Sequence, residues 1–188
     1  MIKDLIKRNR SYRRFYEEKK ISENVLRELV DLARLSPCGR NIQGLRYILS
    51  CTDETNEKIF NNLFWAGYLK EWSGPIKGER PSAYIIMLED TTLGPVAKQD
   101  QGIAAQSMLL GAVEKSLGGC IVANINRKDL ISELNIDDRY EVDLIIALGY
   151  PKEEVVIDEV GKDGNIKYWR DEKEVHHVPK RSLDDLII

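Results

Sequence analysis

The fold of this chain is decided by residues 100–125, DQGIAAQSMLLGAVEKSLGGCIVANI. The first part of this stretch places apolar residues at the spacing of one helical face, namely Ile103, Ala104, Met108, Leu109, Ala112 and Val113. This spacing predicts a long helix from about Val96 to Leu117. Gly118 and Gly119 then end the helical pattern, and Cys120–Ala123 has the composition of a short strand.

The same predicted helix is rich in small residues: Gly102, Ala104, Ala105, Ser107, Gly111 and Ala112. Small side chains allow another element to approach the helix backbone closely. Either a partner helix or a flat ligand fits this surface.

Three more apolar runs predict strands, at Leu45–Ser50, Ala83–Glu89 and Val142–Tyr150. Helices are predicted over residues 2–9, after a cap at Ser22, from Thr52 or Asp53 to Leu63, and from Asn126 to Leu134. The fold class is therefore α+β, with a central, mostly antiparallel sheet of four or five strands flanked by helices. No GxGxxG motif follows a strand, which argues against a Rossmann domain.

Residues 1–188 form a single predicted domain with two C-terminal additions. Within 153–172, VVIDEV, KDGN and IKYW predict a β-hairpin turning at Asp163-Gly164. Residues 173–188 predict an extended apolar arm, which we expect to bury itself against a second subunit. Residues 64–82 predict a partly helical lid, with plain core packing of their aromatic side chains as the alternative.

Composition limits the classes of function. The net charge of −3 argues against a polyanion-binding protein, so a local basic cluster suggests a small anionic ligand. The three cysteines, Cys38, Cys51 and Cys120, show no metal-binding spacing and suit a reducing cytoplasm. The N-terminus is charged from Lys3 onward, unlike a signal peptide. The longest apolar runs are near six residues, whereas a membrane span needs about 20.

Residues 7–14, KRNRSYRR, hold five basic side chains. Arg10 and Arg13, with the hydroxyl of Ser11 between them, have the donors to surround a phosphate. The alternative is a solvated charged surface, which is our interpretation of Lys7, Arg8 and Arg14.

A polar loop follows at residues 36–44, SPCGRNIQG. Its side-chain amides suit the edge of a heterocycle that presents both donors and acceptors; an ordinary helix-to-strand connection is the alternative. Cys38 has no evident base that would make it a nucleophile. Around Gly118 and Gly119, bare backbone amides suit a ligand, and a helix end with a turn is the alternative. With no triad, carboxylate pair or metal motif, the pattern indicates that a cofactor performs the chemistry.

These stretches together resemble the FMN-dependent nitroreductase family. NRSYRRF (9–15) is similar to the family's R-R-S-V-R-x-F, and SPCGRNIQGLRYI (36–48) to its S-P-S-x-x-N-x-Q-P-W-x-F. Residues 100–125 resemble its long helix and following strand. LIIALGYP (144–151) and PKRSLDDLI (179–187) resemble its closing strand and basic C-terminal arm.

The resemblance implies an intertwined homodimer with FMN at each of two subunit interfaces. Phosphate and ribityl contacts are implied for Arg10, Ser11 and Arg13, completed by Lys180 or Arg181 on the arm. The flavin is implied to meet the loop from the other subunit, through Pro37, Cys38, Gly39, Asn41 and Gln43. The ring near N5 is implied to lie beside Ala123 and Asn124.

The implied activity is ping-pong transfer of a hydride from NADH or NADPH to a small acceptor, such as a nitroaromatic or a quinone. Several residues depart from the family pattern: Asn9, Gly44-Leu45, Ile121 and Ala123-Asn124. A different flavin reaction, such as dehydrogenation, reductive dehalogenation or flavin cleavage, is the first alternative. A nucleic-acid- or protein-binding module using residues 7–14 is the second, and the negative net charge argues against it.

Overall fold

A four-stranded antiparallel sheet forms the centre of the computed structural model, which describes residues 1–188. Its strand order is β1 (Leu45–Ser50), β2 (Ala83–Asp90), β4 (Tyr140–Gly149) and β3 (Gly118–Val122). The α+β class and all four strands were predicted. The strand predicted at Cys120–Ala123 begins two residues earlier, because Gly118 and Gly119 are the first residues of β3.

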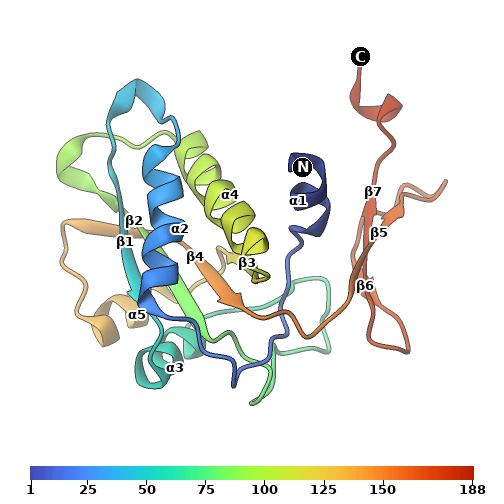
Figure 1. Cartoon of the computed structure of the whole chain (residues 1–188), viewed down its shortest axis with the longest axis horizontal. Coiled ribbons are helices and arrows are strands. Elements are labelled where there is room, and N and C mark those ends of the chain that lie inside the picture. Colours follow the sequence, from blue (N-terminus) through green and yellow to red (C-terminus); the bar gives the residue numbers. More distant parts are fainter.

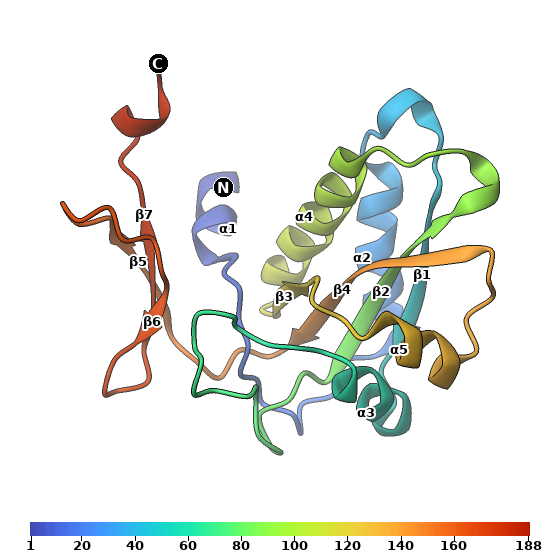
Figure 2. The same ribbon diagram turned by 180° about the vertical axis from the view of Figure 1, so that it is seen from behind.

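Helices cover both faces of this sheet, which explains why β2 is apolar almost throughout (Figures 1 and 2). On one face, α2 (Glu23–Leu35) and α4 (Lys98–Glu114) pack against Ile85 and Met87. On the other face, α3 (Asp53–Asn61) and α5 (Arg127–Leu134) pack against Tyr84 and Ile86. Thr52 and Asn126 cap α3 and α5 with their side chains, as predicted.

The small residues of α4 are used partly for a helix partner within the same chain. A Cβ atom at Gly111 would overlap Cδ1 of Leu32 on α2. This close approach favours the partner-helix interpretation at that position. The prediction that Ile103 is buried is wrong for the single chain, because the contact face of α4 runs through Ala104, Ala105 and Met108 and leaves Ile103 37% exposed.

The C-terminal residues form a separate three-stranded sheet beside α1 (Ile2–Arg8), visible in red in Figure 1. Its order is β5 (Val155–Glu159), β7 (His176–Lys180) and β6 (Trp169–Arg170), with β5 parallel to β7. The predicted hairpin between β5 and β6 is therefore wrong, because β7 lies between them. The backbone N–H groups of Lys173 and Val175 both donate to Asp171 Oδ1 at 2.9 Å, and this turn directs β6 to pair forward with β7.

The rest of the predicted arm is a short 3₁₀ turn, η3 (Asp184–Leu186), with exposed apolar side chains around it. Leu183, Leu186 and Ile187 are each at least 65% exposed in the single chain. Burial of this arm against a second subunit stays a prediction.

The segment 64–82 contains turns but no helix, so the partly helical prediction is wrong. Trp65 is buried in the core beside Ile59, as the alternative proposed. Gly74 has a φ of +123°, and a Cβ atom there would lie 2.6 Å from Cδ1 of Trp65. The glycine lets the backbone turn directly over the indole, which a helix would not allow.

None of the helices combines the length and the apolar character that a membrane span requires. No group of three or more His, Cys, Asp or Glu side chains is arranged to hold a metal ion.

Candidate functional site

Residues 7–14, which we call the basic segment, reach the sheet immediately after α1 ends at Arg8. Ser11 forms a parallel bridge with Gly119 of β3, and the N–H of Tyr12 donates to the Gly119 carbonyl at 3.1 Å. The segment thus lies along the open edge of β3. This places Arg10 and Arg13 next to the glycine pair that sequence analysis selected.

Phe15 anchors the far end of the segment. Its ring is fully buried and lies against Gly149, the last residue of β4. The N–H of Phe15 donates to the Glu79 carbonyl at 2.9 Å, and a further bridge joins Phe15 to Pro151. Residues between Ser11 and Phe15 are therefore held at both ends.

Arg14 is a structural residue, so its assignment to a solvated surface is wrong. Its Nε lies 2.6 Å from Glu79 Oε2 and its Nη2 lies 2.8 Å from Glu79 Oε1, a forked pair. A third contact joins Nη1 to Glu174 at 2.9 Å. Hydrogen bonds from Arg14 lower the pKa of Glu79 to about 2, so this carboxylate is charged at neutral pH. Arg14 ties the basic segment to residues from two distant parts of the chain.

A pocket of about 310 Å³ opens between this segment, α4, β3 and the C-terminal sheet. Four of its lining residues were predicted to hold a phosphate: Arg10, Ser11, Arg13 and Lys180. Lys180 comes from β7, more than 160 residues along the chain from the other three. The structure thus brings together within one chain the cationic residues selected from two separate motifs. We call this cavity the phosphate pocket.

The donors in the phosphate pocket are largely free. Arg10 Nη2 donates to the Ile6 carbonyl at 2.9 Å, but Arg10 Nε is buried and has no partner. Arg13 Nη1 reaches the Ser11 carbonyl at 3.2 Å. Buried polar groups in proteins are usually paired, so an unpartnered guanidinium nitrogen indicates a missing acceptor.

His176 also lines this pocket, although sequence analysis did not select it. Its side chain is almost fully buried, and its Nε2 lies 3.3 Å from Arg13 Nη1. Burial and the nearby positive charges of Arg13 and Arg170 lower the pKa of His176 to about 4. The neutral ring therefore accepts a hydrogen bond from Arg13. The sequence signal for His176 is the alternation of side chains along a strand, which turns one of the two adjacent histidines inward.

The loop at residues 36–44 lies elsewhere in the chain. Pro37, Cys38, Asn41 and Gln43 line a different pocket, of about 280 Å³, that shares no residue with the phosphate pocket. The N–H of Gly39 donates to Asp100 Oδ1 at 2.8 Å, which fixes the loop to the start of α4. Neither histidine lines this pocket, so the structure gives Cys38 no imidazole base.

Ala123, Asn124 and Arg181 are exposed and line neither pocket. The Ala123 carbonyl accepts from Arg127 Nη2 at 3.2 Å, and the Asn124 carbonyl accepts from the N–H of Phe64 at 3.0 Å. Their contacts within one chain are structural. The predicted place of Ala123 and Asn124 beside a flavin ring stays a prediction.

Comparison with known proteins identifies the family. A family model described as the nitroreductase family matches residues 6–73 and 79–150. This chain belongs to the nitroreductase family. Membership makes it an oxidoreductase and agrees with the resemblance carried by the basic segment, the polar loop and the closing strand.

Among curated proteins, the chain is similar to the iodotyrosine deiodinase of Thermotoga neapolitana. The two are 25% identical over 169 residues, which cover 80% of this chain and 89% of the deiodinase. The match thus includes most of the length of the deiodinase.

Solved structures of nitroreductases share the fold. A family member from Streptococcus pneumoniae superposes with a TM-score of 0.67 and 16% identity, covering 82% of this chain and 92% of that one. An FMN-dependent nitroreductase from Clostridium difficile gives 0.65 and 23%, covering 82% and 89%. A family protein from Clostridium novyi gives 0.66 and 18%, covering 98% of both chains.

The nitroreductase match ends at residue 150, before the C-terminal sheet begins. Arg10, Ser11 and Arg13 lie inside the matched region, whereas Tyr168, His176 and Lys180 lie outside it. One wall of the phosphate pocket is thus family sequence. The other wall is a part of this chain that the family model does not describe.

Proposed function

We propose that this nitroreductase-family protein is an FMN-dependent oxidoreductase that takes hydride from NADH or NADPH and passes it to a small acceptor. The observation that carries this proposal is the convergence of Arg10, Ser11, Arg13 and Lys180 on one pocket. Two guanidiniums, an ammonium and a hydroxyl match the oxygens of a phosphate monoester dianion. The unpartnered Nε of Arg10 supplies a donor for one of those oxygens.

Other residues of the pocket suit the rest of FMN. Asn9 Nδ2 donates to Gln106 Oε1 at 3.1 Å, and both amides retain groups that can bond ribityl hydroxyls. Leu109 and Ile121 add apolar surface, and Ile121 is 42% exposed in the single chain. We expect the flat flavin ring to cover this exposed Ile121 side chain at the edge of β3.

When bound, FMN supplies the chemistry, because its N5 position accepts and returns a hydride. The chain's own residues bind and orient it. Arg10, Arg13 and Lys180 neutralise the phosphate, and neutral His176 holds the Arg13 guanidinium in place by accepting its hydrogen bond. Because donor and acceptor use the same face in turn, we expect ping-pong kinetics.

A homodimer is part of this proposal. The polar loop that carries Pro37, Cys38, Gly39, Asn41 and Gln43 lies outside the phosphate pocket, so its proposed contact with flavin requires a second copy. The exposed apolar arm offers surface for such an assembly. We place the protein in the cytoplasm, where Cys38, Cys51 and Cys120 stay free thiols.

The first test is the visible absorption spectrum of the purified protein, which we expect to be that of an oxidised flavin. Steady oxidation of NADH or NADPH with a quinone or a nitroaromatic compound is the second. Arg13→Ala should release FMN, with binding weakened about tenfold or more because a charged hydrogen bond is lost. Lys7→Ala, at an exposed position of α1, is the matched control and should leave flavin occupancy unchanged. A colourless wild-type protein that does not bind added FMN would contradict the proposal.

Reductive dehalogenation is a second candidate, favoured by one observation. The Thermotoga neapolitana relative is named for the deiodination of iodotyrosine and covers 80% of this chain. If this protein shares that activity, its chemically reduced, flavin-loaded form will release iodide from iodotyrosine. Absence of iodide release alongside rapid quinone reduction would exclude this candidate and leave the first one standing.

A further inference from the structure

A polar cavity of about 360 Å³ lies between α3 and the segment that leads into β2, and it shares no lining residue with the phosphate pocket. Ser82 and Tyr84 line it from the strand side, and Asp53, Asn56, Glu57 and Phe60 line it from α3. Arg80 and Lys77 come from the connecting segment. We call this cavity the α3 pocket.

Three buried polar atoms of the α3 pocket have no hydrogen-bond partner: Arg80 Nε, Ser82 Oγ and Tyr84 Oη. The whole chain has nine such side-chain atoms, so a third of them gather in this cavity. Ser82 is 1% exposed and Tyr84 is 0% exposed, and their i, i+2 spacing turns both toward the same side of the sheet. Because buried polar groups are normally hydrogen-bonded, three unpartnered atoms around one cavity indicate a binding site whose ligand supplies the partners.

The free groups of the α3 pocket are mainly donors. The Arg80 guanidinium lies 4.1 Å from the centre of the Phe60 ring, which fixes its plane. Burial raises the pKa of the Tyr84 hydroxyl, which keeps its proton available for donation. The amide of Asn56 is already used, because it donates to the Ser82 carbonyl at 2.9 Å and accepts from Ser50 Oγ at 2.7 Å.

Most of the acidic groups around the cavity are already engaged. Glu17 accepts from the backbone N–H groups of Gly78 and Arg80. Asp53 is paired with Lys20. Glu57 also lines this cavity, and its carboxylate has neither a hydrogen bond nor an ion pair. The balance of free groups therefore favours a negatively charged ligand over a cation.

We propose that the α3 pocket binds a small oxyanion, the carboxylate or phosphate group of a metabolite, through Arg80, Ser82 and Tyr84. The guanidinium donates to the anion from Nε and Nη, and the two hydroxyls donate from the floor of the cavity. This site does not depend on the flavin proposed for the phosphate pocket, since the two cavities use different residues.

Thermal unfolding of the FMN-saturated protein, with sodium acetate and sodium phosphate compared against sodium chloride at equal ionic strength, tests the proposal. At an anion concentration ten times the Kd, we expect the Tm to rise by about 3 °C. A larger shift with acetate assigns a carboxylate ligand, and a larger shift with phosphate assigns a phosphorylated one. Equal Tm values in all three salts would overturn the proposal.

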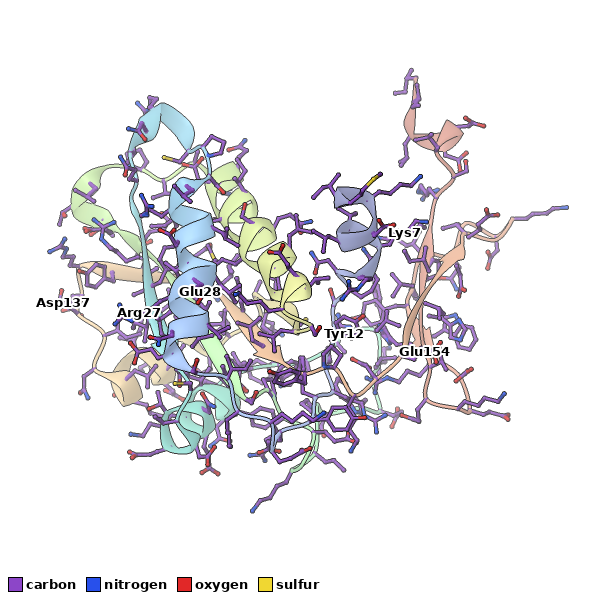
Figure 3. All side chains as sticks on the ribbon, viewed as in Figure 1. Lys7, Tyr12, Arg27, Glu28, Asp137 and Glu154 are labelled. Carbon is purple, nitrogen blue, oxygen red and sulfur yellow. The ribbon has the colours of Figure 1, made fainter.

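Variants assign the binding to this cavity. Arg80→Gln should weaken anion binding at least tenfold, whereas Arg27→Gln, on the outer side of α2 (Figure 3), should leave it unchanged. Glu57→Gln should strengthen binding about threefold, because it removes the unpaired negative charge. Anion binding that is equally strong in Arg80→Gln, or that is lost in Arg13→Ala instead, would contradict the assignment.

Two further variants separate binding from folding. Tyr84→Phe and Ser82→Ala each remove an unpartnered hydroxyl, so the anion-free protein should unfold at the wild-type temperature or higher. Anion binding by both should nevertheless weaken. If both variants retain wild-type affinity, the hydroxyls do not face the ligand and the proposal fails.

Discussion

Arg170 Nη2 donates to Glu153 Oε2 at 2.8 Å, and the two side chains are only 9% and 1% exposed. The other oxygen of Glu153 accepts from the backbone N–H groups of Arg13 and Arg14. The Arg170 guanidinium also lies 4.3 Å from the centre of the Trp72 ring. One buried carboxylate thus joins the C-terminal sheet to the basic segment and sets the backbone position of Arg13.

Glu153→Gln should therefore reduce both stability and flavin affinity. The substitution leaves the Arg170 charge buried without its partner, which costs about 3 kcal/mol in comparable cases. Urea unfolding followed by circular dichroism will measure the loss of stability. FMN titration should show weaker binding, because the glutamine amide has a single oxygen for two sets of donors, Arg170 and the backbone N–H groups of Arg13 and Arg14.

Glu154→Gln is the matched control, since Glu154 is the exposed neighbour labelled in Figure 3. It should change the free energy of unfolding by less than about 0.5 kcal/mol. A stable Glu153→Gln protein with wild-type FMN affinity would show that Arg13 is held by other contacts.

Gly149→Ala should disturb the same site from the other side. A Cβ atom at this position would lie 2.6 Å from Cδ1 and 2.8 Å from Cβ of Phe15, so the ring has to move. Overpacking of this kind destabilises a core by about 1–3 kcal/mol. Because Phe15 anchors the segment two residues beyond Arg13, FMN binding should weaken as well.

Gly102→Ala is a control that we expect to change the stability in the opposite direction. A Cβ atom there would meet nothing within 4 Å, and Gly102 lies inside α4. The protein should become about 0.5–1 kcal/mol more stable, because alanine has the higher helix propensity. Thermal unfolding of the two variants side by side distinguishes steric conflict from a general effect of replacing glycine.

The central sheet was predictable from sequence because its strands carry a strong local signal. β2 is a continuous apolar run between polar residues, and the start of β1 follows directly from its composition. The caps at Thr52 and Asn126 were also local. In each case, the physical cause lies within a few residues of the effect.

Where the cause is distant, prediction failed. The sequence predicts a surface position for Arg14, because its partners, Glu79 and Glu174, lie 65 and 160 residues away along the chain. It predicts a hairpin because the Asp163-Gly164 turn is visible in the sequence, whereas the insertion of β7 between β5 and β6 is not. Of the residues predicted to hold a phosphate, Arg10, Ser11, Arg13 and Lys180 line one pocket and Arg181 does not, whereas the contacts of His176 and Glu153 are apparent only in three dimensions.

His176 should make the flavin-free protein less stable as the pH falls. Its pKa is lowered to about 4 in the folded chain, below an ordinary value near 6.5. The unfolded chain therefore binds a proton first, and stability declines as the pH falls from about 6.5 toward 4. Between pH 8 and pH 5 we expect a loss on the order of 1 kcal/mol, because solvent screens part of the effect.

His176→Gln should remove that part of the pH dependence, as urea unfolding at several pH values will show. His177 provides the contrast. Burial lowers its pKa, but the hydrogen bond with Asp158 and the nearby negative charge of Asp171 more than offset this and raise it overall. Its stabilising contribution is present at low pH and is lost as the pH rises, so His177→Gln should be most harmful in acid. Identical pH profiles for wild type and His176→Gln would show that the ring is not held neutral.

The apolar arm gives the last prediction. Residues 182–188 follow β7 and carry Leu183, Leu186, Ile187 and Ile188, all largely exposed in the single chain. Apolar surface of this kind is typical of a subunit contact. A chain ending at Arg181 keeps Lys180 and all of β7, so we expect a folded protein whose dimer dissociates at higher concentration than the wild-type dimer.

Sedimentation equilibrium of the two chains will measure this change in dimer affinity. Leu183→Ser combined with Ile187→Ser is a milder version of the same test, because it keeps the chain length and the backbone. FMN binding should fall together with dimerisation if the polar loop at 36–44 meets the flavin from the second copy. A truncated protein that stays fully dimeric and loaded with flavin would show that the arm is not part of the interface.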